Sequence, residues 1–96
     1  MPTYESEALF RRQFASLTDE QKRLFGIAVA KFVADLRAGP GFRRGLRIRG
    51  LARRPGEYEL TWAPDGRAVF RYGDPVRDGE THVVWLRIGS HDVLDA

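Results

Sequence analysis

The stretch from Tyr58 to Tyr72, YELTWAPDGRAVFRY, decides the fold, because two alternating apolar segments flank a turn signal at Pro64-Asp65-Gly66. A bulged turn with Gly66 in the left-handed position would pair Ala63 with Arg67. Counting outward, the predicted pairs are Trp62 with Ala68, Leu60 with Phe70, and Tyr58 with Tyr72. All six side chains then share one apolar face. A two-residue turn would instead mix arginines into that face, so hydrophobic consistency selects the bulged register.

The opposite face of this hairpin is mostly polar. It would carry Glu59, Thr61, Arg67, Val69 and Arg71, with Glu59 opposite Arg71. Two further alternating segments predict strands at residues 46–49 and from about 82 to 88. In the first, Arg47 and Arg49 point to the polar face. In the second, Val84, Leu86 and Ile88 would point inward, so that Val83, Trp85 and Arg87 point outward.

Two amphipathic helices are predicted before the strands. The first begins near Ser6 as N-cap and carries an apolar stripe that includes Phe10 and Phe14. The second begins at Thr18, where Gln21 completes a capping box, and ends at residues 39–41, Gly-Pro-Gly. The short link between them favours an antiparallel helix hairpin. The sequence therefore predicts one α+β domain over residues 1–96, with the helices packed on one face of a mostly antiparallel sheet of three or four strands.

Composition bounds the function classes. The 96 residues include no cysteine, which excludes disulfides and thiolate metal sites. No apolar stretch is long enough to span a membrane, so we expect a cytoplasmic protein. Net charge is only +3, yet seven arginines fall between residues 37 and 54 with no acidic residue among them. This clustering favours a polyanionic partner, although base composition alone would also enrich arginine.

The polar face of the predicted sheet is the candidate site. Its arginines are Arg47, Arg49, Arg67, Arg71 and Arg87, with Arg53 and Arg54 in a neighbouring basic loop. Guanidinium groups match phosphate geometry, and an exposed Trp85 would stack on a base unless the C-terminal tail covers it. His91 follows in a turn and titrates near neutral pH. These groups suit RNA cleavage by the 2′-hydroxyl, which needs a base, an acid and positive charge on the phosphorane.

Other polar residues have simpler interpretations. His82 begins its strand and is interpreted as structural. His82 and His91 lack a third ligand at familiar spacing, so neither a metal nor another cofactor is predicted. Glu59 is either a general base or an ion-pair partner of Arg71. Val93 and Leu94 are expected to tuck back against the sheet.

Three segments, in this order, resemble the RelE/ParE toxin superfamily of bacterial toxin–antitoxin systems. They are Gly56–Leu60 (GEYEL), Gly66–Tyr72 (GRAVFRY) and Leu86–Asp92 (LRIGSHD). The last is similar to the Arg-x-Gly-x-His ending of YafQ-like members. The resemblance implies a short strand before the helices, which Pro2 to Glu5 would supply. It also implies a ribosome-dependent endoribonuclease that cleaves mRNA, with catalytic residues His91, Arg67 and Arg87. Its partner would be a cognate antitoxin with an acidic segment that suits a basic face.

Two alternative functions stay open. A ParE-like poison of DNA gyrase shares the fold without an acid–base set, and His91 argues against it. A non-toxic relative would use the basic face to bind RNA or an acidic protein. This second alternative is motivated by Glu59 and Thr61, which stand where RelE places lysines, and by Val93 or Leu94 in place of a closing aromatic residue.

Overall fold

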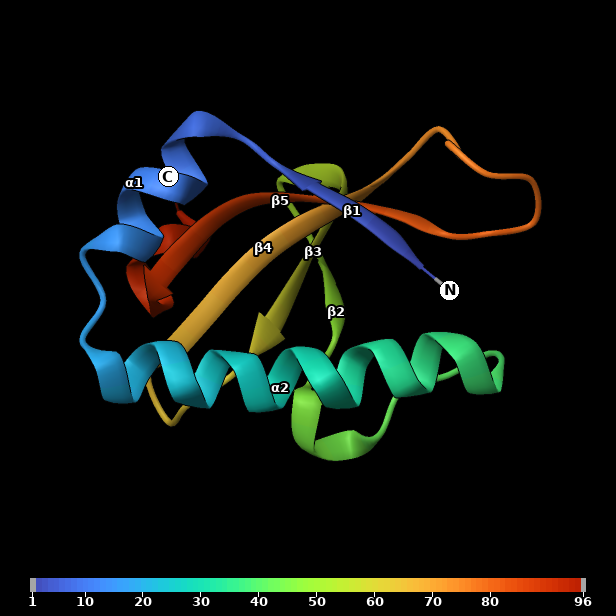
Figure 1. Ribbon diagram of the computed structural model, residues 1–96. Coiled ribbons are helices and arrows are strands. Elements are labelled where there is room, and N and C mark those ends of the chain that lie inside the picture. The colour runs from blue at the N-terminus through green and yellow to red at the C-terminus, as the bar shows by residue number, and fades with distance from the viewer. Residues whose placement is uncertain (1, 96) are drawn as a thin grey trace.

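A computed structural model of the chain, which describes residues 2–95, shows two helices on one face of a five-stranded sheet (Figure 1). The helices are α1 (Ala8–Ala15) and α2 (Asp19–Ala38). The strands are β1 (Thr3–Ser6), β2 (Arg49–Leu51), β3 (Arg54–Thr61), β4 (Gly66–Gly73) and β5 (His82–Ser90). Two 3₁₀ turns complete the chain, η1 (Arg44–Leu46) and η2 (His91–Leu94). The α+β class is confirmed.

The sheet has the order β1-β5-β4-β3-β2 and is mostly antiparallel, as predicted. Its strand count of five exceeds the expected three or four. The additional width comes from both edges. The predicted N-terminal strand is present as β1 and pairs with β5 in parallel, while β2 forms only a short edge against β3.

Local sequence signals set the helix boundaries. Thr18 caps α2 through the predicted capping box, because its hydroxyl accepts from the Gln21 backbone at 3.1 Å and the Gln21 side chain accepts from the Thr18 backbone at 2.8 Å. The prediction that α1 starts at Ser6 is wrong by one residue, since Glu7 is its N-cap. Ser6 instead pairs with Trp85 at the end of β1. Strand pairing therefore overrides the capping preference of this serine.

The β3–β4 hairpin keeps the predicted faces but not the predicted partners. Leu60 lies opposite Ala68, Tyr58 opposite Phe70, and Glu59 opposite Val69. The register thus differs from the prediction by two residues, which leaves every side chain on its expected face. The cause is a turn of the same length that lies one residue earlier: the Trp62 amide donates to the Gly66 carbonyl, and the Gly66 amide donates to the Ala63 carbonyl. Arg71 consequently faces Glu57 rather than Glu59. The predicted left-handed conformation of Gly66 is wrong, since its φ is not positive.

Gly66 is required by packing at this turn. A β-carbon at this position would lie 2.6 Å from the Trp62 indole, which is buried among core side chains and has little room to move. We expect Gly66→Ala to lower the free energy of unfolding by about 1–3 kcal/mol through this overpacking. Chemical denaturation measures the change, and Gly45→Ala, where a β-carbon meets no atom within 4 Å, is the control. Equal stability of the two variants would contradict the packing argument.

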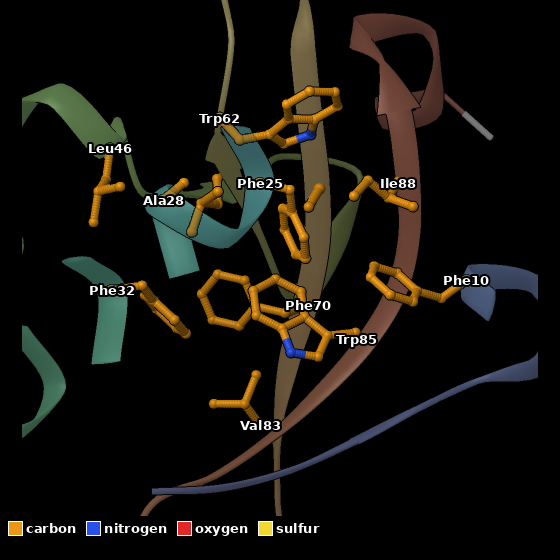
Figure 2. Packing of buried hydrophobic residues seen from close by; sticks show 12 residues of the cluster. Phe10, Phe25, Ala28, Phe32, Leu46, Trp62, Phe70, Val83, Trp85 and Ile88 are labelled. Carbon is orange, nitrogen blue, oxygen red and sulfur yellow. The ribbon is translucent and has the colours of Figure 1, made fainter. Parts of the chain in front are cut away.

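The main core lies between the sheet and the helices and is rich in aromatic residues (Figure 2). At its centre Trp85, 5% exposed, packs against Phe10, Phe25, Phe32 and Phe70 with ring centroids 5.3–5.9 Å apart. The prediction that Trp85 lies on the outer face is therefore wrong. It is covered by the two helices and is not available to stack on a base.

A β-bulge explains this reversal. Val69 pairs with Arg87, but the next residue, Phe70, pairs with Trp85, so Leu86 has no partner on β4. One additional residue inverts the alternation of a strand. Ile88 and Arg87 therefore lie on their predicted faces, whereas Val83 and Trp85 join the main core and Val84 and Leu86 do not.

A second, smaller apolar cluster lies on the outer face, defined here as the sheet face away from the helices. Val69, Val84 and Leu86 form its buried centre, and Val93 and Leu94 of η2 pack over it, as predicted for the tail. This cover fixes the C-terminal residues next to the strands that precede them. Within residues 2–95, no helix has the length and apolar character needed to cross a membrane.

The segment before β2 is not the strand that was predicted. Residues 44–46 form η1, Leu46 is buried, and Arg47 adopts left-handed backbone angles with φ 50° and ψ 45°. β2 begins only at Arg49. Arg47 therefore leaves the outer face of the sheet, while Arg49 remains on it opposite Glu59.

Candidate functional site

His91 forms the centre of the candidate site, at the end of the sheet where β4 begins and β5 ends. Gly66 pairs with Ser90 and Arg67 pairs with Gly89, so the β3–β4 turn lies directly beside η2. Across this junction the Nδ1 atom of His91 lies 2.6 Å from the Asp65 carboxylate. A carboxylate only accepts hydrogen bonds, so Nδ1 carries the hydrogen and donates it. In the neutral imidazole, Nε2 is then free to accept a proton.

Charge around His91 favours its protonated form. The hydrogen bond and the charge of Asp65 raise the pKa of His91, with a further contribution from Asp92, whose carboxylate lies 3.6 Å from Nε2. Burial and the Arg67 guanidinium act in the opposite direction. The same hydrogen bond lowers the pKa of Asp65. His91 and Asp65 therefore remain an imidazolium–carboxylate pair to higher pH than an isolated histidine would, and His91 becomes a neutral base above its raised pKa.

This pairing predicts a measurable pH effect. If neutral His91 is the base, activity rises with pH through its pKa, and Asp65 shifts that limb to higher pH because it stabilises the protonated form. We expect Asp65→Asn to move the acidic limb of the kcat/KM profile to lower pH. Titration of the imidazole by NMR measures the same shift without turnover. An unchanged imidazole pKa in Asp65→Asn would contradict the assigned contact.

Arg67 lies at the same end of the sheet. Its Nη1 group donates to carbonyl oxygens of the turn, at 3.0 Å from Gly66 and 3.3 Å from Ala63 and Pro64. Its charge is close enough to act on both His91 and Asp65. The structure therefore brings together two of the predicted catalytic residues, an imidazole and a guanidinium held by the turn.

Arg87, the third predicted catalytic residue, is built into the fold. Its side chain is 8% exposed, Nη2 donates to Glu57 at 2.9 Å, and Nε donates to the Val93 carbonyl at 2.9 Å. The second bond connects β5 to η2, the turn that begins with His91. The charge of Arg87 is thus largely matched by Glu57. Its position suits a residue that holds His91 in place rather than one that binds phosphate directly.

Glu59 pairs with Arg49 across β3 and β2, not with Arg71 as expected. The Glu59 side chain is 3% exposed, and Oε2 has no hydrogen-bond partner within residues 2–95. Arg49 provides its charge partner from the solvent side. Of the two interpretations left open by the sequence, the ion pair is the one present, although with a different arginine.

The other predicted RNA-binding arginines lie away from His91. Arg71 is exposed on β4, four residues beyond Arg67, or about 13 Å at the rise of a strand. Arg53 and Arg54 lie where β3 begins, at the opposite end from the hairpin turn. Arg47 lies beside η1. Arg49, Arg67, Arg71 and Arg87 therefore share the outer face as predicted, while the placement of Arg47 on that face is wrong. Two of the four, Arg49 and Arg87, are paired with carboxylates, so the face is less cationic than predicted.

Two site residues were not predicted, Asp65 and Glu57. Asp65 occupies a turn position for which aspartate is common, and this ordinary role conceals its contact with His91. The sequence around Glu57 does contain a pattern that indicates ion pairing. Glu57 alternates with Glu59 on a strand whose opposite neighbours are arginine-rich, so buried ion pairing was a reasonable expectation. Both contacts depend on the true register, which the sequence alone did not define.

His82 is held as a structural residue, as predicted. It is buried, and its ring nitrogens lie 2.8 Å from the Thr3 hydroxyl and 2.7 Å from Glu5, which fastens β1 to β5. No cluster of three or more histidine, cysteine or acidic side chains suited to a metal occurs within residues 2–95.

Comparison with solved structures places this arrangement in a known fold. YafQ from E. coli aligns over 100% of both chains with a TM-score of 0.64 and 15% identity. A chain of the E. coli DinJ–YafQ complex aligns over 100% of both chains with a TM-score of 0.67 and 13% identity. A copper-bound mutant toxin from Helicobacter pylori covers 98% of this chain and 99% of its own, with a TM-score of 0.62 and 19% identity. No family model and no curated protein sequence matches the chain. The chain has the fold of the YafQ toxin, which confirms the fold that the resemblance in its sequence implied.

Proposed function

We propose that this protein is the toxin of a type II toxin–antitoxin pair and an endoribonuclease that cleaves mRNA at the ribosome through attack of a 2′-hydroxyl. The observation that carries the proposal is the His91–Asp65 contact of 2.6 Å beside the Arg67 guanidinium. The fold shared with YafQ supports the same class of protein. Arg67 and His91 occupy, by resemblance, the phosphate-stabilising and catalytic positions of that class.

The proposed reaction uses His91 as an acid–base group. Neutral His91 accepts the 2′-hydroxyl proton at Nε2, and the 2′-oxygen attacks the adjacent phosphorus. The bond from phosphorus to the 5′-oxygen breaks, and that oxygen takes a proton from imidazolium or from water. Asp65 orients the ring and stabilises its charged form, while Arg67 offers positive charge to the phosphorane. The products are a 2′,3′-cyclic phosphate and a 5′-hydroxyl.

A cognate antitoxin follows from the proposed class. The DinJ–YafQ complex shows such a pairing for YafQ. The present chain carries a net charge of +3, with arginines exposed on η1 and β4, so an acidic antitoxin segment is complementary in charge. Binding of that segment near η2 would prevent access of RNA to His91.

The chemistry of the cut ends tests the proposal. Purified protein is added to ribosomes that translate a defined mRNA, and the fragments are examined for their termini. We expect a cyclic phosphate or 3′-phosphate on one fragment and a 5′-hydroxyl on the other. Fragments with 5′-phosphate and 3′-hydroxyl ends, or intact mRNA together with intact growth on expression, would disprove the proposed reaction.

A binding function without cleavage is the second candidate. It is favoured by the pairing of Arg49 with Glu59 and of Arg87 with Glu57, which removes two cations from the predicted face. Under this alternative, RNA binding that weakens steeply with salt is expected without fragments and without a growth defect. Fragmentation by the wild-type protein and not by its His91 variant separates the two.

A further inference from the structure

Three adjoining grooves lie on the side of the molecule formed by α2, η1 and the β3–β4 turn. The first, of about 450 Å³, is lined by four arginines beside Phe42 and Ile48. The second, of about 430 Å³, has an apolar floor that includes Ile27 and Trp62. The third, of about 180 Å³, ends at Asp65 and Ser90. Two of the arginines that the sequence placed on the sheet face, Arg47 and Arg49, line the first groove.

Shared lining residues show that neighbouring grooves adjoin one another. Arg43 and Arg47 line both the first and the second groove. Trp62 and Ala63 line both the second and the third. The third ends at Ser90, the residue before His91. One path therefore leads from the arginines of η1, past the hairpin, to the His91–Asp65 pair.

The path is strongly cationic. Arg44, Arg47 and Lys31 line it and form no ion pair within residues 2–95, whereas Arg43 is held by Asp35 at 2.8 Å. Asp65, at the far end, is the single acidic side chain among the described residues that line the three grooves. Unpaired guanidinium groups beside a groove favour phosphate, because their planar donors match its oxygens.

Arg47 shows an additional feature of this surface. It is the one non-glycine residue within residues 2–95 with positive φ, at 50°. A left-handed backbone is unfavourable for a long side chain and tends to occur where function requires it. Here it places arginine, not glycine, at the junction of two grooves. No hydrogen bond or ion pair of its side chain compensates for this conformation within the described residues.

We propose that this path binds the phosphodiester backbone of RNA, with Arg44 and Arg47 contacting phosphates several nucleotides from the bond presented to His91. This inference rests on the proposed function and assigns it an RNA-binding surface on the helix side of the molecule. RNA is favoured over an acidic protein segment because the cations are concentrated at one end of a path that leads to the acid–base pair. The RNA would be either message or a folded RNA such as that of the ribosome.

Binding to uncleavable RNA tests this surface separately from catalysis. Fluorescence anisotropy measures the Kd of wild-type protein for a single-stranded oligonucleotide and for a hairpin, both fully 2′-O-methylated so that no 2′-hydroxyl is available. The variant is Arg44→Ala with Arg47→Gly, since glycine accepts the left-handed backbone and folding is preserved. The control is Arg37→Ala with Arg77→Ala, which removes the same charge from residues that line none of the three grooves.

We expect the groove variant to bind about tenfold more weakly, and the slope of log K against log salt to fall by about 1.4 for the single strand, for two lost phosphate contacts. The control should retain its slope. A larger loss on the single strand identifies message as the ligand, and a larger loss on the hairpin identifies folded RNA. If the groove variant binds both RNAs with wild-type affinity and wild-type salt slope, the proposal is overturned, and an acidic protein becomes the better candidate ligand of the groove. Because no cleavage is measured, this result is independent of whether the protein is a nuclease.

Discussion

His91→Ala is expected to reduce mRNA cleavage by about 10²–10⁴-fold, the usual contribution of a positioned acid–base side chain. The loss follows from geometry, because Asp65 holds Nδ1 of His91 at 2.6 Å and leaves Nε2 to exchange the proton, with the charge of Arg67 nearby. The side chain is 62% exposed and supports no part of either apolar cluster, so stability should change little. Single-turnover cleavage of a translated mRNA measures the rate, and thermal unfolding verifies the fold.

Asp92→Asn is a suitable control for that variant. Asp92 is adjacent and exposed, and its carboxylate lies 3.6 Å from His91, but it does not orient the ring through Nδ1. We expect it to retain most of the cleavage rate, with a small shift of the acidic limb to lower pH since Asp92 also raises the pKa of His91. Cleavage by His91→Ala at the wild-type rate would exclude the proposed acid–base role.

The sequence predicted faces better than partners. In the β3–β4 hairpin, hydrophobic alternation placed Leu60, Ala68 and Phe70 correctly in the core, while their pairing was displaced by two residues. A displacement of two leaves alternation unchanged, so no pattern of apolar residues can detect it. The position of the turn decides the register, and the sequence around Pro64-Asp65-Gly66 is compatible with turns that begin at either of two neighbouring residues.

β5 shows the opposite failure. The sequence analysis treated β5 as a regular strand and therefore placed Trp85 on the outer face. In the structure, a bulge at Leu86 places Trp85 in the core. Val83 to Leu86 are all apolar, so the segment has no alternation from which the bulge could be inferred. The indole of Trp85 instead packs against four phenylalanine rings in the main core, those of Phe10, Phe25, Phe32 and Phe70. These contacts can be recognised only once the helices are placed on the sheet, because three of the four phenylalanines lie on α1 and α2.

Only part of the candidate site could be predicted from the sequence, because some of its contacts depend on the strand register. His91 and Arg67 were identified from residue chemistry and resemblance, and both lie at the junction of the β3–β4 turn with η2. Arg47 was assigned to the sheet because Leu46 and Ile48 alternate with arginines, but Gly45 and the basic run before it allow a 3₁₀ turn instead. The carboxylates that match the arginines, Glu57 and Glu59, were underestimated because their partners depend on the register.

Arg87→Ala is expected to lower the free energy of unfolding by about 2–4 kcal/mol and to reduce cleavage more than tenfold. Removing one member of a buried ion pair leaves the other uncompensated, and Glu57, 22% exposed, would lose its partner. The bond from Nε to the Val93 carbonyl would also be lost, which frees η2 and the His91 that begins it. Urea denaturation measures the first effect and cleavage at saturating RNA the second.

The double variant Arg87→Met with Glu57→Leu separates stability from positioning. Apolar residues of similar volume often replace a buried ion pair without loss of stability, so we expect much of the unfolding free energy to return. Methionine cannot donate to the Val93 carbonyl, so cleavage should remain low and the imidazole of His91 should lose its raised pKa as contact with Asp65 weakens. Recovery of both stability and full cleavage would show that Arg87 contributes only to packing. Stability that returns without cleavage would identify the guanidinium as the group that connects the fold of the sheet to the placement of His91.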